Sequence, residues 1–168
     1  MLASALDDDP EDMHPDAREF VAEVRKFGWM ATHVYAGDAT PSFTYTTGLS
    51  VLRNQPELIV FCLDMETAHG VLSNVVREAD KRPSLPIGAP ISGVLESGGI
   101  VLFPTTAAKH AEWLLRSVWF YGTDDFPCQQ VVFPDRNGRF PWQDGVDPAF
   151  RDLQPDLTGT QWASNLRH

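Results

Sequence analysis

The sequence predicts an α+β fold: a single domain with one mixed, mainly antiparallel β-sheet and about three helices. Apolar residues recur at helical spacing in three stretches, and strand-like runs lie between these stretches in groups. The expected order is helix, three strands, helix, two strands, helix, strand, which differs from the strict alternation of a doubly wound sheet. A chain of 168 residues suits one hydrophobic core.

The first helix and the first hairpin are marked by local signals. Asp16 as N-cap and Glu19 three residues later form a capping-box pattern before an apolar stripe that ends at Gly28. Residues rich in β-formers follow, interrupted by a Gly-Asp-Ala-Thr-Pro turn. We therefore expect a hairpin of two strands at residues 29–35 and 43–47.

A buried strand and a second helix come next. Residues 58–63 are continuously apolar, which is typical of a central strand covered on both faces. Cys62 belongs to this run, so its thiol is expected to be buried and unreactive. Asp64 then caps a helix whose apolar positions are Met65, Ala68, Leu72, Val75, Val76 and Ala79.

The last elements are a hairpin, a helix and a strand. Residues 91–95 and 100–103 flank a Glu-Ser-Gly-Gly turn. Thr105 or Thr106 caps a third helix, and a final strand covers residues 128–133. The helix is expected to face the core with Ala107, Ala111, Leu114, Leu115 and Val118.

Charge and apolar patterning predict where the domain begins and ends. The net charge is −10, and residues 1–19 hold seven acidic residues against one basic residue. Residues 1–13 lack apolar periodicity and are expected to be an acidic disordered tail, followed by a single domain over residues 14–150. Patterning fades after that point, so residues 151–168 are expected to be a C-terminal extension.

Composition excludes several classes of function. The 13 basic residues form no stripe, so no nucleic-acid partner is expected. No 18-residue apolar run or signal-peptide pattern is present, which favours a cytoplasmic protein without a membrane partner. Cysteine and histidine lack the spacings of a zinc site, and the Asp-Arg-Asn-Gly turn lacks later calcium ligands, so no metal is expected. The cofactor and the oligomeric state stay undetermined.

Four stretches of the chain together resemble one protein family. They are Phe43 to Leu49, Pro56-Glu57-Leu58, Gln130 to Asp135, and Gly138-Arg139-Phe140-Pro141-Trp142. In this order they are similar to the bacterial family known as domain of unknown function 4262, over roughly residues 28–150. Related sequences often carry Gly-His before Pro-Glu-Leu, whereas this chain has Asn54-Gln55, so a histidine role there does not carry over.

Two of these stretches supply candidate ligand contacts. The strand end offers hydroxyls and the later turn offers rigid aromatic area held by prolines. Asp135 and Asn137-Gly138 should fix the turn and bring its side chains beside the strand end. Cross-strand packing and cover for the core are the alternative roles. The candidates are Tyr45, Thr46, Thr47, Gly48, Asp135, Arg139, Phe140 and Trp142.

Histidines add two further candidates. His33 shares a strand face with Tyr35, and His69 borders the apolar stripe of its helix. Packing at the edge of the core is the alternative for both. His14 and His168 lie near the termini and His110 is expected on a charged helix face, so these three are set aside.

The sequence is best interpreted as a soluble binding domain for a small molecule or a protein partner, with the site between the strand end and the turn. Whether it is an enzyme stays open. One alternative is a small flavin-dependent or related redox enzyme, because the strand–helix order loosely resembles flavin-reductase barrels. Another is an immunity or regulatory protein whose acidic surface masks a basic protein partner.

Overall fold

A single five-stranded sheet organises the chain, whose computed structural model describes residues 2–167. The sheet order is β1-β2-β3-β5-β4, in which β3 and β5 are parallel and the other neighbours are antiparallel. This confirms an α+β fold with one mixed sheet. The strands are β1 (Met30–Val34), β2 (Phe43–Thr47), β3 (Glu57–Phe61), β4 (Val101–Pro104) and β5 (Cys128–Val132).

Six α-helices, rather than about three, are present in the described residues. The predicted third helix is split because Leu114 leaves helical geometry, with φ −101° and ψ 54°. Two further helices have only four residues each, which is too short for a periodic pattern. The helices are α1 (Pro15–Phe27), α2 (Leu49–Leu52), α3 (Met65–Asp80), α4 (Ala107–Trp113), α5 (Leu115–Tyr121) and α6 (Pro148–Arg151).

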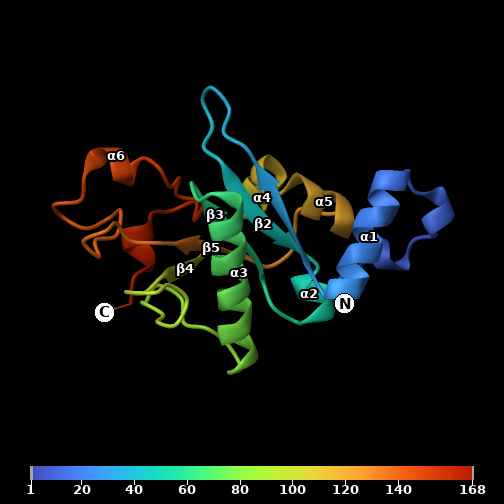
Figure 1. The fold of residues 1–168 in the computed structure, drawn as a ribbon, viewed down its shortest axis with the longest axis horizontal. Helices are drawn as coiled ribbons and strands as arrows, with labels where there is room; N and C mark the ends of the chain where they lie inside the picture. The colour runs from blue at the N-terminus through green and yellow to red at the C-terminus, as the bar shows by residue number, and fades with distance from the viewer. Residues whose placement is uncertain (1, 168) are drawn as a thin grey trace.

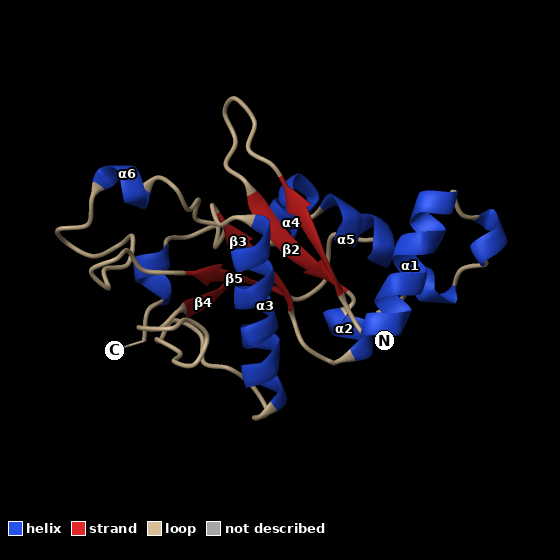
Figure 2. Cartoon of the chain, viewed as in Figure 1, coloured by secondary structure: helices blue, strands red, loops and turns tan. Residues whose placement is uncertain are grey.

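Helices cover both faces of the sheet, which produces two main hydrophobic clusters (Figures 1 and 2). On one face α3 packs Leu72 against Val60 of β3. On the other face α1, α4 and α5 pack around Phe61, with Phe120 in the same cluster. Alternate residues of β3 therefore point into different clusters, as expected for a central strand buried on both sides.

The N-terminal residues fold back onto α1, which differs from the expected disordered tail. Residues 5–12 form two short 3-10 helices, and Ala5 is only 3% exposed. The guanidinium of Arg25 donates a hydrogen bond to the Leu6 carbonyl at 2.8 Å. His14 caps α1 in place of Asp16, because its Nδ1 accepts the Asp16 N–H at 3.2 Å and Pro15 occupies the first helical position.

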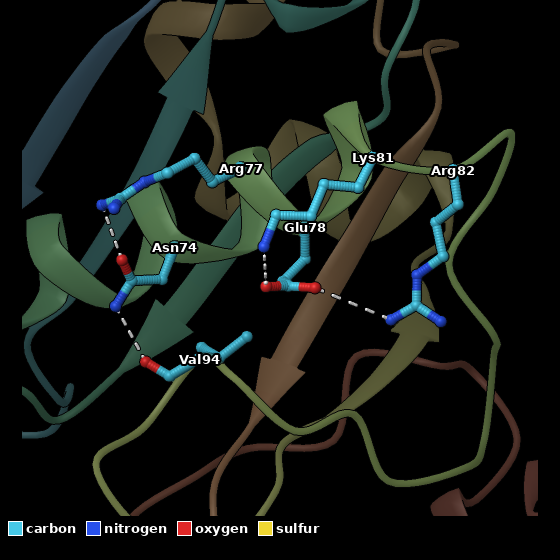
Figure 3. Close-up of polar contacts among 6 residues, drawn as sticks. All are labelled: Asn74, Arg77, Glu78, Lys81, Arg82 and Val94. Atoms are coloured by element: carbon cyan, nitrogen blue, oxygen red, sulfur yellow. Dashed lines mark hydrogen bonds and ion pairs between the residues drawn. The ribbon is translucent and has the colours of Figure 1, made fainter.

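Side chains in the second half of α3 contact the long connection between α3 and β4 (Figure 3). The Asn74 amide donates to the Val94 carbonyl at 2.9 Å, which ties the connection to the helix. The carboxylate of Glu78 lies 2.9 Å from the Lys81 ammonium and 4.0 Å from the Arg82 guanidinium. The hydrogen bond from Lys81 lowers the pKa of Glu78 below its ordinary value, so this carboxylate stays charged.

The turn after β5 has the predicted geometry. Oδ1 of Asp135 accepts the N–H groups of Asn137 and Arg139, each at 2.9 Å. Gly138 has a φ of +79°, which glycine adopts without steric penalty. The prediction that Asp135 and Asn137-Gly138 fix this reversal is confirmed.

The aromatic residues of the turn and the C-terminal segment form a third hydrophobic cluster. Trp142 stacks on Phe140 with ring centroids 4.9 Å apart, and it contacts Phe103 and Trp162 edge-on at 5.4 and 5.8 Å. Phe140 and Trp162 are each 7% exposed. The turn and the C-terminal segment thus cover one end of the sheet, the alternative role that the sequence left open.

We expect Trp142→Ala to lower the free energy of unfolding by about 3 kcal/mol, the low end for a truncated core aromatic because the indole is half-buried. Urea unfolding followed by circular dichroism measures this difference. Trp119→Ala is the matched control, since that side chain is 46% exposed and should change stability little. Equal midpoints for the two variants would show that Trp142 does not hold the cluster together.

Candidate functional site

The strand-end motif and the turn motif lie at opposite ends of the sheet. Phe43 at the start of β2 pairs with Phe61 at the end of β3, and Glu57 at the start of β3 pairs with Cys128 at the start of β5. The end of β2 therefore lies where β5 begins, whereas the turn follows the end of β5 (Figure 1). The expectation that Arg139, Phe140 and Trp142 lie beside the Tyr45 strand end is wrong, because strand order and direction separate them.

A buried carboxylate, Glu57, explains why the two early family stretches occur together. Its Oε2 accepts the Thr46 hydroxyl at 2.5 Å, and its Oε1 accepts the N–H groups of Gly48 and Ser50 at 2.9 and 3.3 Å. Oε1 also accepts the hydroxyl of Tyr121 on α5. One carboxylate therefore connects the end of β2, the first turn of α2 and α5.

The remaining polar atoms of the strand end are also committed to internal contacts. The Thr47 hydroxyl lies 2.7 Å from Ser117 Oγ, which donates to the Thr46 carbonyl at 2.9 Å. Gly48 has a φ of +109°, and a Cβ there would lie 2.7 Å from Val24 Cγ1. Thr46, Thr47 and Gly48, three predicted ligand contacts, are buried and serve the packing role that was their alternative.

Burial sets the protonation of Glu57. Loss of water raises the pKa of this carboxyl above its ordinary value, and the hydrogen bonds from Thr46, Tyr121, Ser50 and Gly48 only partly oppose that rise. The pKa of Tyr121 is also raised, first by burial and then by the charge of Glu57. The folded protein therefore holds the Glu57 proton more tightly than the unfolded chain.

This shift predicts a pH dependence of stability that Glu57→Gln removes. Because the folded pKa is raised, the contribution of Glu57 is complete below the ordinary glutamate pKa of 4.5 and is lost as pH rises through the folded pKa. We expect the free energy of unfolding of the wild type, relative to Glu57→Gln, to fall as pH rises from about 4.5. Urea unfolding at a series of pH values measures the difference. A constant difference would contradict the raised pKa.

A cavity lies on the α1–α5 side of the sheet, and we call it the Tyr45 pocket. Its volume is about 480 Å³, a size typical of small-ligand sites. Leu115 and Trp119 line it with 64% and 46% of their surface exposed. Its walls are Phe20, Ala17, Leu115, Trp119 and Tyr45, and its polar lining residues are Thr32, Arg116, His14 and Asp16.

Two polar groups of the pocket are held in place by its walls. The Tyr45 hydroxyl accepts the backbone N–H of Arg116 at 2.9 Å. The Arg116 guanidinium lies over the Phe20 ring, with Cζ 4.8 Å from its centroid, and forms no ion pair with any residue from 2 to 167. Burial raises the pKa of Tyr45 above its ordinary value, so the phenol keeps its proton at neutral pH.

Thr32 contributes an unsatisfied hydroxyl to the same pocket. Its Oγ1 is buried and makes no hydrogen bond of ordinary geometry within the described part of the chain. Tyr45 faces Thr32 across the β1–β2 ladder, and a hydrogen-bonding contact with the Thr32 hydroxyl is the smallest of the effects that oppose the rise in the pKa of Tyr45 caused by burial. A buried polar atom without a good partner destabilises the protein, and because this oxygen is shielded from solvent, a ligand reaches it only if the side chains around it move.

His33 and His69 come together in a separate groove beside β1. Together with Ala31, Thr44, Met65 and Glu66 they line a hollow of about 380 Å³ on the α3 face. Nδ1 of His33 lies 2.7 Å from Thr44 Oγ1, and His69 stacks on Trp29 with centroids 5.4 Å apart. Both rings thus have contacts of the kind expected for histidines at the edge of a core.

Sequence reasoning missed the residues of the α1–α5 side. Leu115 was expected to face the core, but it lines the opening of the pocket. Trp119 lies outside the predicted apolar stripe of its helix, and an aromatic in that position is the signal that could have identified the site. His110, expected on a charged face, is 2% exposed and contacts the Asp124 carbonyl through Nδ1 at 2.8 Å. Burial lowers the pKa of His110 below its ordinary value.

The cysteine thiol and the possible metal ligands offer little support for catalysis or metal binding. Cys62 follows β3 instead of lying within it and has a φ of +57°. Its thiol lies 2.9 Å from the Leu153 carbonyl, and burial raises the thiol pKa, which disfavours the thiolate. Residues 2–167 contain no cluster of three or more potential metal ligands. No helix in the same span is long and apolar enough to cross a membrane.

The fold and the pocket define the class as an α+β domain that has a cavity beside a buried polar network. The chain belongs to the family described as domain of unknown function (DUF4262), whose family model matches residues 23–147. The match contains all five strands and also Thr32, Tyr45, Leu115, Arg116 and Trp119 of the pocket. Comparisons with curated proteins and with solved structures each gave no match.

Proposed function

We propose that the protein is a binding domain that takes a small ligand with a ring-sized apolar part into the Tyr45 pocket. The observation that carries this proposal is the meeting, in one cavity of about 480 Å³, of an exposed indole and a guanidinium that has no ion pair within residues 2–167. Proteins rarely leave such groups together without a partner, because each loses hydrogen bonds or exposes apolar area. The ligand covers the exposed indole of Trp119.

The proposed site still combines aromatic and hydroxyl side chains, as the sequence predicted, but most of its residues differ from the predicted ones. Tyr45 remains, and its partners are Thr32 on the adjacent strand and Trp119 on α5 in place of the turn after β5. The pocket is preformed, because α5 is fixed through the backbone N–H of Arg116, which donates to the Tyr45 hydroxyl, and through the side-chain hydroxyl of Ser117, which donates to the Thr46 carbonyl. A preformed pocket binds without an ordering cost.

Indole is a suitable neutral probe, and ligand-observed NMR titration measures its binding. We expect the wild type to bind indole and Trp119→Ala to bind it about five-fold more weakly, which corresponds to about 1 kcal/mol for a lost aromatic pair. Phe27→Ala is the matched control, since Phe27 is an aromatic side chain 59% exposed that does not line the pocket.

Equal indole binding by the wild type, Trp119→Ala and Phe27→Ala would contradict the proposal, because binding would then occur elsewhere. Absence of indole binding to the wild type would also contradict it.

A further inference from the structure

From the charges around the Tyr45 pocket, we propose that its ligand is a free zwitterionic α-amino acid with an apolar or aromatic side chain. This inference rests on the proposed binding function and names the class of ligand. The carboxylate of the ligand pairs with Arg116, its ammonium group lies toward Asp16, and its side chain packs on Trp119.

The cation in the pocket favours a carboxylate. The Arg116 guanidinium is held over the Phe20 ring but has no acidic partner in the described chain. A guanidinium presents paired N–H donors that match the two oxygens of a carboxylate. Tyr45 lines the same cavity, and its hydroxyl keeps its proton and brings no negative charge to the site.

The acidic surroundings exclude a ligand with a net negative charge. A neighbouring hollow of about 390 Å³ shares His14, Ala17 and Trp119 with the Tyr45 pocket. Asp8, Asp9 and Asp12 line this hollow, and the whole chain carries a net charge of −10. These carboxylates repel an anion and attract an ammonium group. A purely cationic ligand, in turn, would place its charge beside Arg116.

Helix geometry places Asp16 and the Phe20 ring, over which Arg116 lies, on the same face of α1. Asp16 and Phe20 lie four residues apart on α1, so Asp16 is one helical turn from the ring that carries Arg116. Leu115 and Trp119 have the same spacing on α5 and form the opposite, apolar wall. Two opposite charges that line one pocket beside an apolar wall match the ammonium, carboxylate and side chain of one amino acid.

Isothermal titration calorimetry with three related probes tests the inference. The probes are phenylalanine, 3-phenylpropanoate, which lacks the ammonium group, and 2-phenylethylamine, which lacks the carboxylate. We expect the wild type to bind phenylalanine at least about ten-fold more tightly than either analogue, because each lost charge pair removes roughly 1.4 kcal/mol.

Two variants test which residue binds each charged group of the ligand. Arg116→Met should weaken phenylalanine and 3-phenylpropanoate and leave 2-phenylethylamine unchanged or tighter, whereas Asp16→Asn should weaken phenylalanine and 2-phenylethylamine. Both side chains are exposed, and the hydrogen bond to Tyr45 uses the Arg116 backbone, so the fold should persist. Arg136→Met and Asp38→Asn, exposed charges outside the pocket, are the matched controls and should change nothing.

Each outcome decides between distinct conclusions. Binding of either analogue as tightly as phenylalanine overturns the zwitterion inference and identifies an anionic or a cationic ligand class. Binding of indole but of none of the three charged probes also overturns it, yet leaves the proposed binding function intact. Failure of indole and of all three probes overturns both.

Discussion

The buried carboxylate of Glu57 is the interaction on which the arrangement of the site depends. It accepts four hydrogen bonds, two from side chains and two from backbone N–H groups. Through Tyr121 these bonds fix α5 against the start of β3, and through Thr46 they fix the end of β2. Because Thr46, Gly48 and Tyr121 are buried with this acceptor, removal of the carboxylate would leave several polar groups unsatisfied at once.

The same attachment creates the Tyr45 pocket. With the end of β2 tied to α5, Tyr45 points between α5 and α1, and its hydroxyl caps the backbone of Arg116. The helix faces that line the cavity then present Trp119 and Arg116 outward and keep Phe120 and Tyr121 in the core. The family stretches around Thr46 and Glu57 thus have a structural role, because they hold the strand end and α5 together. The groups that a ligand can contact, such as Arg116 and Trp119, lie nearer the surface.

Local features of the fold could be predicted from the sequence, whereas the site could not. The alternation of apolar and polar residues and the apolar runs predicted β1, β2, β3 and β5. The turn at Asp135 was predicted because Asn-Gly accepts a positive φ and Asp accepts hydrogen bonds from its own turn. The parallel pairing of β3 with β5 is a contact between distant segments, and no local pattern encodes it. That pairing separates the turn from the strand end. Likewise, the break at Leu114 redirects α5 and exposes Leu115, which periodicity assigned to the core.

Chemical-shift mapping on the amide NMR spectrum tests the central claim most directly, because it locates binding without assuming a site. On addition of phenylalanine, the account predicts that the largest shifts fall on the amides of Thr32, Arg116 and Trp119, with the Arg116 amide reporting its bond to the Tyr45 hydroxyl. The largest shifts at His33 and His69, or in the turn from Asp135 to Trp142, would contradict the account, since they would place the ligand away from the Tyr45 pocket.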